Sequence, residues 1–352
     1  MQPKQSLALR LQLCAALSCL IATSTPIANA AGDSSDALRA IELCKQGKAK
    51  EALPFFDIAL KKAPGDAQLF YNRALAFQNL GETDKSIQDY SSCLRLAPLN
   101  AKAYYNRALA YMSKNDYSRA KRDLDRVTVI DRKNADAFLN RGNIFYAVEQ
   151  YQNALKDFDK SIELSPSAQA YINKGNTEQR MGLHQQAAVD YGEAIKLDTK
   201  ATKAIFERAL LFLCLEKYPI AIKDANKYIE LKSWKDEGSP YACFIKLFAA
   251  KLGKDRKAER SAIAELEAHS SGSEWSQTIA SFLVGKKTDK QFLAIAGTNN
   301  DRLTEAYTYI AMKQYCEGKG KESQPNFSWV IEKGNKLFDE FTLSKAMIKK
   351  IK

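Results

Sequence analysis

The apolar and polar residues of this chain follow a pattern that recurs about every 34 residues. The segment YNRALAF (71–77) returns as YNRALAY (105–111), an offset of 105 − 71 = 34 residues. LNRGNIF (139–145) and INKGNTE (172–178) follow at almost the same spacing. A pattern with this period predicts an array of short structural units that stack along the chain.

Each unit is predicted to be a hairpin of two helices. If the repeated segment occupies positions 5 to 11, six units begin at residues 33, 67, 101, 135, 168 and 202. Positions 8 and 20 are small in all six, and position 24 is large and apolar in five. Two helices approach closely only where side chains are small, and a large residue fills the space beside them. These residues are Ala40, Ala74, Ala108, Gly142, Gly175 and Ala209 (position 8), Ala52, Ser86, Ala120, Ala154, Ala187 and Ala221 (position 20), and Phe56, Tyr90, Leu124, Phe158 and Tyr191 (position 24).

The predicted hairpins also have recognisable helix ends. Glycine stands at position 15 in three units, where it suits a left-handed helix end, and Asn115 is the tolerated substitute. Proline stands at position 32 in three units and cannot continue the second helix. These residues are Gly47, Gly81, Gly182, Pro64, Pro98 and Pro166. Since one hairpin cannot bury its apolar face alone, neighbouring hairpins must stack.

This pattern resembles that of the tetratricopeptide repeat (TPR) proteins. The resemblance implies an all-α fold, a right-handed superhelical solenoid of TPR helical hairpins. The expected repeats span residues 33–66, 67–100, 101–134, 135–167, 168–201 and 202–235.

Residues 236–352 are predicted to form a degenerate helical extension. The repeat pattern breaks there and returns in a late TPR-like unit at residues 304–337, before a last amphipathic helix from about Phe338 to Lys350. EWSQTIASFLVGK (274–286) and this late unit look like the NlpI-type bacterial envelope TPR lipoproteins. That resemblance implies an envelope adaptor.

Asparagine occupies position 6 in four successive units. In TPR proteins, positions 2, 5, 6, 9, 12 and 13 of the first helix face the concave side. An asparagine amide offers a donor and an acceptor together, which matches one peptide group of an extended chain. The alternative is that these asparagines are helix-surface residues without a ligand. The expected peptide-binding residues are Tyr71, Asn72, Lys102, Tyr105, Asn106, Asn140, Asn143, Asn173, Asn176 and Lys203.

A clamp for a peptide's carboxylate terminus is a sharper form of this hypothesis, and the sequence argues against it. Asn143, Asn173 and Lys203 fit three places of the clamp pattern seen in TPR proteins. Leu139 stands where the first lysine is expected, and Glu207 replaces the arginine. Glu207 would repel the carboxylate that such a clamp holds.

A second polar pattern pairs a basic residue at position 7 with an aspartate at position 23 of the same unit. Because arginine can bind a carboxylate through two parallel hydrogen bonds, the pattern predicts ion pairs between the two helices. The matched aspartates argue against nucleic-acid binding through these arginines. The pairs are Arg73 and Asp89, Arg107 and Asp123, Arg141 and Asp157, Lys174 and Asp190, and Arg208 and Asp224.

Residues 1–30 are predicted to be a secretory signal peptide. Lys4 and Arg10 precede the apolar run LQLCAALSCLIA (11–22), and ANA (28–30) provides small residues before a cleavage site. The chain is therefore expected to be exported, periplasmic or secreted, with cleavage after Ala30. The alternative is an uncleaved anchor, and membrane association is expected only in that case.

The net charge of the chain narrows the classes of molecule that it is expected to bind. The formal net charge is +12, and loss of Lys4 and Arg10 leaves 12 − 2 = +10. Outside the cytosol this positive charge favours acidic proteins, anionic lipid head groups or acidic wall polymers as partners, or serves solubility alone.

Five of the seven cysteines remain after cleavage, and they form no C-x-x-C motif. This favours buried thiols over a disulfide framework, although one disulfide bridge remains an alternative.

The sequence shows no motif for catalysis, metal or cofactor. Its two histidines, His184 and His269, stand apart, and there is neither a phosphate-binding loop nor a nucleophile elbow. We therefore predict a non-catalytic scaffold or adaptor that binds a protein or peptide segment in a concave groove. One alternative is a structural protein that self-associates into a homo-oligomer, and another is an enzyme or wall-polymer binder.

Overall fold

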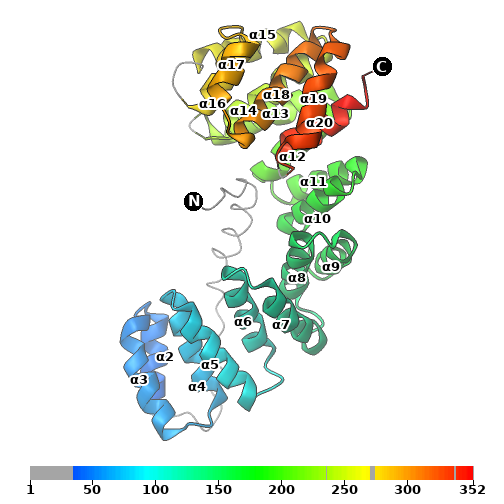
Figure 1. Cartoon of the computed structure of the whole chain (residues 1–352). Coiled ribbons are helices and arrows are strands. Elements are labelled where there is room, and N and C mark those ends of the chain that lie inside the picture. Colours follow the sequence, from blue (N-terminus) through cyan, green and yellow to red (C-terminus); the bar gives the residue numbers. More distant parts are fainter. Residues whose placement is uncertain (1–34, 235, 270–273, 337, 352) are drawn as a thin grey trace. The chain divides into compact units, whose positions relative to one another are not determined.

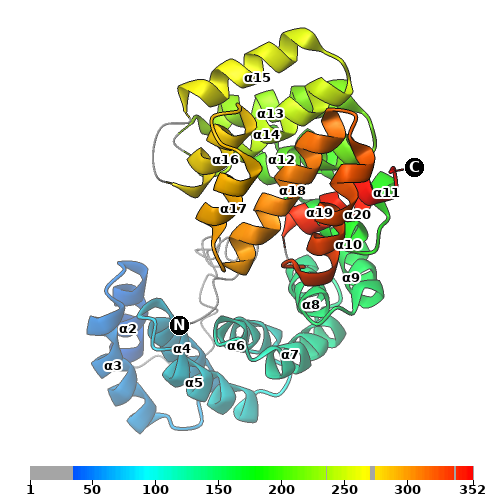
Figure 2. The same cartoon turned by 45° about the horizontal axis from the view of Figure 1, so that its top comes forward.

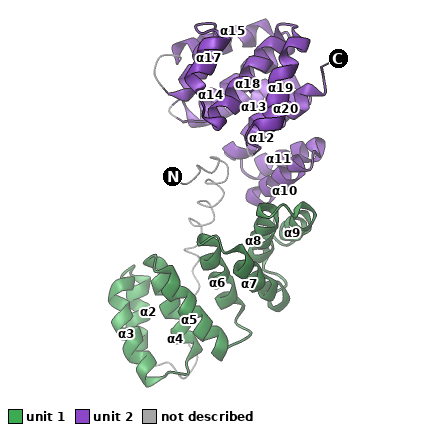
Figure 3. Cartoon of the chain, viewed as in Figure 1, with its two compact units in different colours: residues 1, 3, 5–166 green, residues 2, 4, 167–352 purple. Residues whose placement is uncertain are grey.

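The computed structural model describes residues 35–234, 236–269, 274–336 and 338–351, and the predicted signal peptide lies outside them. The described residues fold into nineteen helices, α2 to α20, without a strand (Figure 1). The chain divides into two compact units, of which unit 1 ends at Pro166 and unit 2 begins at Ser167 (Figure 3). This architecture confirms the predicted all-α solenoid of helical hairpins.

Unit 1 contains four hairpins. Their first helices are α2 (Ser35–Lys45), α4 (Ala67–Asn79), α6 (Ala101–Ser113) and α8 (Ala135–Ala147). Their second helices are α3 (Ala49–Lys62), α5 (Thr83–Leu96), α7 (Tyr117–Ile130) and α9 (Tyr151–Leu164). In Figure 2, α2, α4, α6 and α8 line the inner side of this unit.

Unit 2 begins with two hairpins of the same kind and continues into the C-terminal extension. The hairpins are α10 (Ala168–Arg180) with α11 (His184–Leu197), and α12 (Thr202–Cys214) with α13 (Tyr218–Lys232). The extension contains α14 (Ser239–Leu252), α15 (Arg256–Ala268), α16 (Trp275–Leu283), α17 (Asp289–Ala296), α18 (Asn300–Cys316), α19 (Gly320–Lys333) and α20 (Asp339–Ile348).

Short polar residues and left-handed residues fix where the helices begin and end. The side chains of Asp66, Asn100, Asn134 and Ser167 each accept a hydrogen bond from a backbone N–H in the first turn of the helix that follows. Position 15 has a positive φ in all six repeats, including two with glutamate there. The residues are Gly47, Gly81, Asn115, Glu149, Gly182 and Glu216.

The small residues at positions 8 and 20 are buried between helices, as predicted. Ala40, Ala52 and Phe56 of the first hairpin are all fully buried. At Gly142 even a Cβ atom would lie 2.6 Å from Cε1 of Phe158, so the glycine permits a close approach of α8 and α9. The contact of small and large residues therefore closes the first five hairpins, whereas the sixth has Ala225 at position 24.

The C-terminal extension has its own apolar core. Phe244, Phe248, Phe282, Phe292 and Phe327 are buried together in one cluster, which also takes in residues of α12 and α20. The late repeat corresponds to α18 and α19, which pack against each other. The extension is thus a packed part of unit 2.

The predicted ion pairs between positions 7 and 23 are confirmed in all five hairpins that have them. Arg107 donates from Nε to Asp123 Oδ2 at 2.8 Å and from Nη2 to Oδ1 at 2.7 Å. Arg73, Arg141 and Arg208 make the same paired contacts, and Lys174 lies 3.5 Å from Asp190.

In unit 1 the remaining guanidinium nitrogen reaches the preceding hairpin. Nη1 of Arg73 lies 2.6 Å from Asp57 Oδ1 on α3, and Nη1 of Arg141 lies 3.0 Å from Asp125 Oδ1 on α7. Nη1 of Arg107 donates to Ser91 Oγ on α5 at 3.0 Å. Each arginine therefore joins the two helices of its own hairpin and also ties that hairpin to the one before it.

These ion pairs form a ladder along the hairpins of unit 1, and we expect loss of one of its carboxylates to destabilise that unit. Asp123→Asn keeps the size of the side chain but leaves the guanidinium of Arg107 without its charged partner. Because the pair is mostly shielded from water, the free energy of unfolding should fall by about 1–3 kcal/mol in denaturant titrations followed by circular dichroism. Glu163→Gln, which breaks an exposed pair with Lys160, is the control and should change stability by about 0.5 kcal/mol or less. Equal effects of the two substitutions would contradict this role of the ladder.

Candidate peptide-binding face

The surface predicted to bind a peptide lies on the first helices of the hairpins. We define the inner face of unit 1 as repeat positions 6, 9 and 13 on α2, α4, α6 and α8, together with position 2 on α4, α6 and α8. The structure brings Asn72, Lys102, Asn106, Asn140 and Asn143 together on these helices. Their side chains differ in what they can offer to a ligand.

Asn106 and Asn140 are used inside the fold. Both are buried, and each donates from Nδ2 to a tyrosine of the preceding hairpin. The acceptor is the Tyr71 hydroxyl for Asn106, at 3.0 Å, and the Tyr105 hydroxyl for Asn140, at 2.9 Å. These amides therefore link neighbouring first helices, and their donors already have partners.

Asn72 differs from Asn106 and Asn140 in its hydrogen bonds. Its Oδ1 accepts a hydrogen bond from Gln68 Nε2 at 3.0 Å, but its buried Nδ2 has no partner among the described residues. The tyrosines lie 35 residues before Asn106 and Asn140, and the residue 35 before Asn72 is Ala37. Since alanine has no hydroxyl, the first hairpin lacks the acceptor that the later ones provide.

A row of aliphatic side chains lies among the polar residues of the inner face. Ile41, Leu75 and Leu109 occupy position 9 in three successive hairpins, and each is partly exposed. Leu38, at position 6 of the first hairpin, is 53% exposed. Lys102 at position 2 is exposed, whereas Asn143 at position 9 of the fourth hairpin is half-buried. The sequence hypothesis emphasised the asparagines and did not include these aliphatic residues.

In unit 2 the candidate asparagines are buried. Asn173 Oδ1 accepts from Gln169 Nε2 at 2.6 Å. The hydroxyl of Tyr191 lies 2.7 Å from Asn176 Oδ1 and 2.8 Å from Gln179 Oε1. Asn176 thus joins α10 to α11, whereas the bond of Asn173 to Gln169 lies within α10.

Lys203 lies beside the C-terminal helix. It is at position 2 of α12, where its charge acts on Glu207 and on Asp339 of α20. Nη1 of Arg180 donates to the carbonyl of Lys336 at 2.8 Å, just before α20. Nζ of Lys350, just after it, lies 2.7 Å from the carbonyl oxygen of Cys214 and 2.8 Å from Glu216 Oε1. The chain's own C-terminal segment therefore occupies this side of α12.

Buried carboxyl groups surround the first turn of α20. Burial raises the pKa of Glu207 to about 8 and that of Glu340 to about 7, and the charge of Asp339 adds to both shifts. Burial also raises the pKa of Asp339 and, together with the charge of Glu340, that of Glu305. Arg180 and Lys203 oppose the shifts of Glu207 and Asp339. The tyrosines Tyr241 and Tyr309 donate to Glu305 at 3.0 Å and to Glu340 at 2.8 Å.

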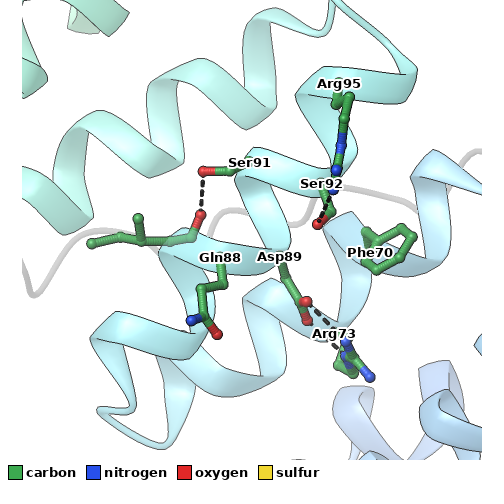
Figure 4. Close-up of a pocket in the computed structure, with 8 residues that line it drawn as sticks. Phe70, Arg73, Gln88, Asp89, Ser91, Ser92 and Arg95 are labelled. Atoms are coloured by element: carbon green, nitrogen blue, oxygen red, sulfur yellow. Dashed lines mark hydrogen bonds and ion pairs between the residues drawn. The ribbon is translucent and has the colours of Figure 1, made fainter.

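A groove of different character lies where α4 meets α5. It is lined by Phe70, Arg73, Asp89, Ser92 and Arg95, among others (Figure 4). The close-up shows Arg73 turned to Asp89 and Arg95 to Ser92. The groove thus contains one pair of the ion-pair ladder, that of Arg73 and Asp89, and its arginines already have partners.

The described residues contain no group of side chains that could hold a metal ion. No described helix combines the length and apolarity needed to cross a bilayer. The five described cysteines are free thiols, and Cys93, Cys214 and Cys243 are buried, so the bridge left open by the sequence is not formed.

Sequence profiles of the tetratricopeptide repeat match residues 37–101, 71–120, 135–167 and 168–200. The chain carries tetratricopeptide repeats. TPR hairpins stack into extended arrays whose concave surfaces bind other molecules, so the family is associated with protein interaction. A comparison with curated protein sequences found no match.

Solved TPR structures resemble this chain. The C-terminal part of a TPR repeat-containing protein from Cytophaga hutchinsonii is 17% identical, with 66% of this chain and 94% of that one covered and a TM-score of 0.58. YrrB, described as a TPR protein with an unusual peptide-binding site, is 22% identical over 52% of this chain and 93% of its own (TM-score 0.46). MamA is 20% identical over 50% of this chain and 99% of its own, with a TM-score of 0.45. The Cytophaga likeness shows a shared fold, and the NlpI-type resemblance stays a prediction.

The two kinds of asparagine should respond differently to an apolar substitution. Asn106→Leu leaves the buried hydroxyl of Tyr71 without its partner, so the free energy of unfolding should fall by about 1–2 kcal/mol. Asn72→Leu removes an amide donor that is already unsatisfied, so the change should be smaller, within about 0.5 kcal/mol. Urea titrations of both variants measure the difference. A larger loss in Asn72→Leu would show that its amide has a structural partner after all.

The carboxyl cluster should make unit 2 less stable as the pH rises. An unfolded carboxyl group titrates near about pH 4. Between that pH and the raised folded values, folded unit 2 holds more protons than the unfolded chain, so its stability falls with rising pH. The lowered pKa of Lys203 has the opposite effect on stability. Stability rises with pH between the pKa of folded Lys203 and the ordinary lysine value of 10.5. The groups that face the cluster are Arg180, Lys203, Glu207, Glu237, Tyr241, Asp301, Glu305, Tyr309, Asp339 and Glu340.

Thermal unfolding of the wild type and two variants measures this dependence. We expect the Tm of unit 2 to fall between about pH 5.5 and about pH 8, and to fall less in Glu207→Gln, which cannot ionise. Glu332→Gln, at an exposed position of α19, should retain the wild-type dependence. A Tm that rises over this range in the wild type would show that the carboxyl groups do not control stability here.

Proposed function

We propose that this chain is an exported, non-catalytic scaffold that binds a segment of another protein on the inner face of unit 1. The observation that carries the proposal is the row of partly exposed aliphatic side chains at position 9, Ile41, Leu75 and Leu109, in successive hairpins. The strongly exposed Leu38 extends this apolar surface. Large side chains left partly open in a row on one face are typical of surfaces that bind a partner.

The spacing and chemistry of this face favour a polypeptide ligand. The row crosses three hairpins, so it suits an elongated ligand with apolar side chains at intervals. Lys102 supplies a positive charge at its edge, and amide groups at position 6 border it. A rigid surface that is formed before binding lowers the entropic cost of binding. The arginines that would otherwise suggest nucleic acid are engaged by aspartates.

Export is the part of the proposal that rests on sequence alone. It is supported by the charged, apolar and small-residue regions of residues 1–30. The compartment would be the periplasm or the exterior, and membrane association would require that the segment stays attached. A second candidate function is a structural homo-oligomer in which this face binds a second copy.

Photo-crosslinking in the native host tests the proposal. A crosslinking residue replaces Leu109 on the inner face and, in a control chain, Val129, which is 63% exposed on α7. We expect a distinct protein adduct from position 109 alone, identified by mass spectrometry. Self-adducts from position 109, together with a dimer in sedimentation, would instead favour the homo-oligomer. The same adducts from both positions would reject the inner face as the binding surface.

Binding affinity then tests the residues of the face. Leu75→Asp places a charge in the apolar row and should weaken binding of the captured segment at least about tenfold, or about 1.4 kcal/mol. Lys102→Glu, at an exposed position, tests the charge without disturbing the core, and Val129→Asp is the matched control. Circular dichroism of each variant checks that the helices are intact. Unchanged affinity in folded Leu75→Asp and Lys102→Glu chains would contradict the proposed site.

A further inference from the structure

The C-terminal helix α20 lies on the side of α12 that corresponds to the inner face in unit 1. Lys203, Glu207 and Cys214 occupy positions 2, 6 and 13 of α12. Asp339 of α20 acts electrostatically on Lys203 and Glu207, and Lys350 donates to the carbonyl of Cys214. α20 therefore covers in unit 2 the positions that a ligand would contact in unit 1.

α20 packs against α12, α18 and α19 through an apolar patch, with polar contacts at both ends. Leu343 and Met347 are buried in the apolar core of unit 2, and Ser344 Oγ lies 3.2 Å from Thr308 Oγ1. The acidic first turn, Asp339 and Glu340, lies among Arg180, Lys203 and Tyr309. This is how a groove recognises an amphipathic helix, through apolar anchors at helical spacing and complementary charges at the end.

Two features make this contact easier to open than the rest of unit 2. α20 has ten residues, which is too short for a stable isolated helix, so it remains helical only while it is docked. Its docking also buries carboxyl groups close to other carboxyl groups, which opposes the apolar gain. A short terminal helix held in this way is the kind of element that opens locally before a whole unit unfolds.

We propose that the surface formed by α12, α18 and α19, with Lys203, Glu207 and Cys214 on its α12 side, is a binding site for an amphipathic helix with an acidic first turn. α20 is the ligand of this site within one chain, and the competing occupant is the α20 of a second copy. Exchange of α20 between two copies joins them without any contact that the single chain lacks, as in other domain-swapped dimers. This inference concerns unit 2 and does not depend on the ligand proposed for unit 1.

Complementation between two full-length variants tests the exchange. Leu343→Asp disables the helix and leaves the α12 site intact, whereas Lys203→Glu disables the site by repelling the acidic turn and leaves the helix intact. We expect each variant alone to be a monomer in analytical ultracentrifugation, and an equimolar mixture to form a 1:1 dimer. Lys345→Asp, on the exposed side of α20, replaces Leu343→Asp in the control mixture and should give no dimer. Folded variants that stay monomeric when mixed would overturn the exchange.

A labelled peptide of residues 338–352 tests the site itself. In the wild type the peptide competes with a tethered helix at an effective concentration on the order of millimolar, so it should bind weakly. It should bind the Leu343→Asp chain at least about tenfold more tightly, and a peptide with Asp339→Asn and Glu340→Gln should lose the part of the affinity that comes from the acidic turn. Equal affinity of the first peptide for wild type and Leu343→Asp would show that it binds elsewhere.

Hydrogen exchange of the unmodified chain provides an answer even if a variant does not fold. The amides of α20 should exchange faster than those of α12, α18 and α19, because α20 opens alone. Exchange of α20 at the same rate as these three helices would show that it detaches only when unit 2 unfolds, and this result would overturn the proposal.

Discussion

The structure depends on one contact, in which a small residue at position 8 faces a large residue at position 24 of the same hairpin. In the fourth hairpin, where Gly142 faces Phe158, no space remains for a Cβ atom. It closes the hairpin, but it leaves apolar surface on both sides of the pair of helices. That surface can be buried only against the next hairpin, so no single hairpin is stable by itself. The stacking of units and the solenoid both follow from this limit.

Polar side chains then fix how one hairpin meets the next. Arg73 and Arg141 each join an aspartate of their own hairpin to one of the preceding hairpin, so one guanidinium sets both distances. On the inner side, Asn106 performs a similar linking role through Tyr71. When all of their hydrogen bonds are satisfied, buried polar groups serve mainly to specify one arrangement of the core and contribute less to its stability. What remains for a ligand is therefore the surface that these links do not use.

The local features of the fold could be predicted from the sequence, because each depends on residues within one unit. The small residues, the left-handed ends and the pairing of Arg107 with Asp123 all recur at fixed spacing. The use of Asn106 inside the fold depends on a residue of the preceding unit, and a signal for it was present: tyrosine lies 35 residues before Asn106 and Asn140, but not before Asn72. The electrostatic interaction of Lys203 with Asp339 spans 339 − 203 = 136 residues and has no period, so the repeat could not reveal it.

Position 6 shows how one substitution changes the use of the same surface. In α4, α6 and α8 it holds neutral amides, and those of Asn106 and Asn140 donate to a tyrosine hydroxyl without any charge to compensate. In α12 it holds Glu207, whose carboxyl group is buried and needs Arg180, Lys203 and a hydrogen bond from Gln179 to offset the loss of water. Because ionising a buried carboxyl group is costly, Glu207 keeps its proton near neutral pH, and the charge of Asp339 on α20 raises its pKa further. Position 6 thus holds amides that join neighbouring hairpins in α6 and α8, and a buried carboxyl group beside α20 in α12.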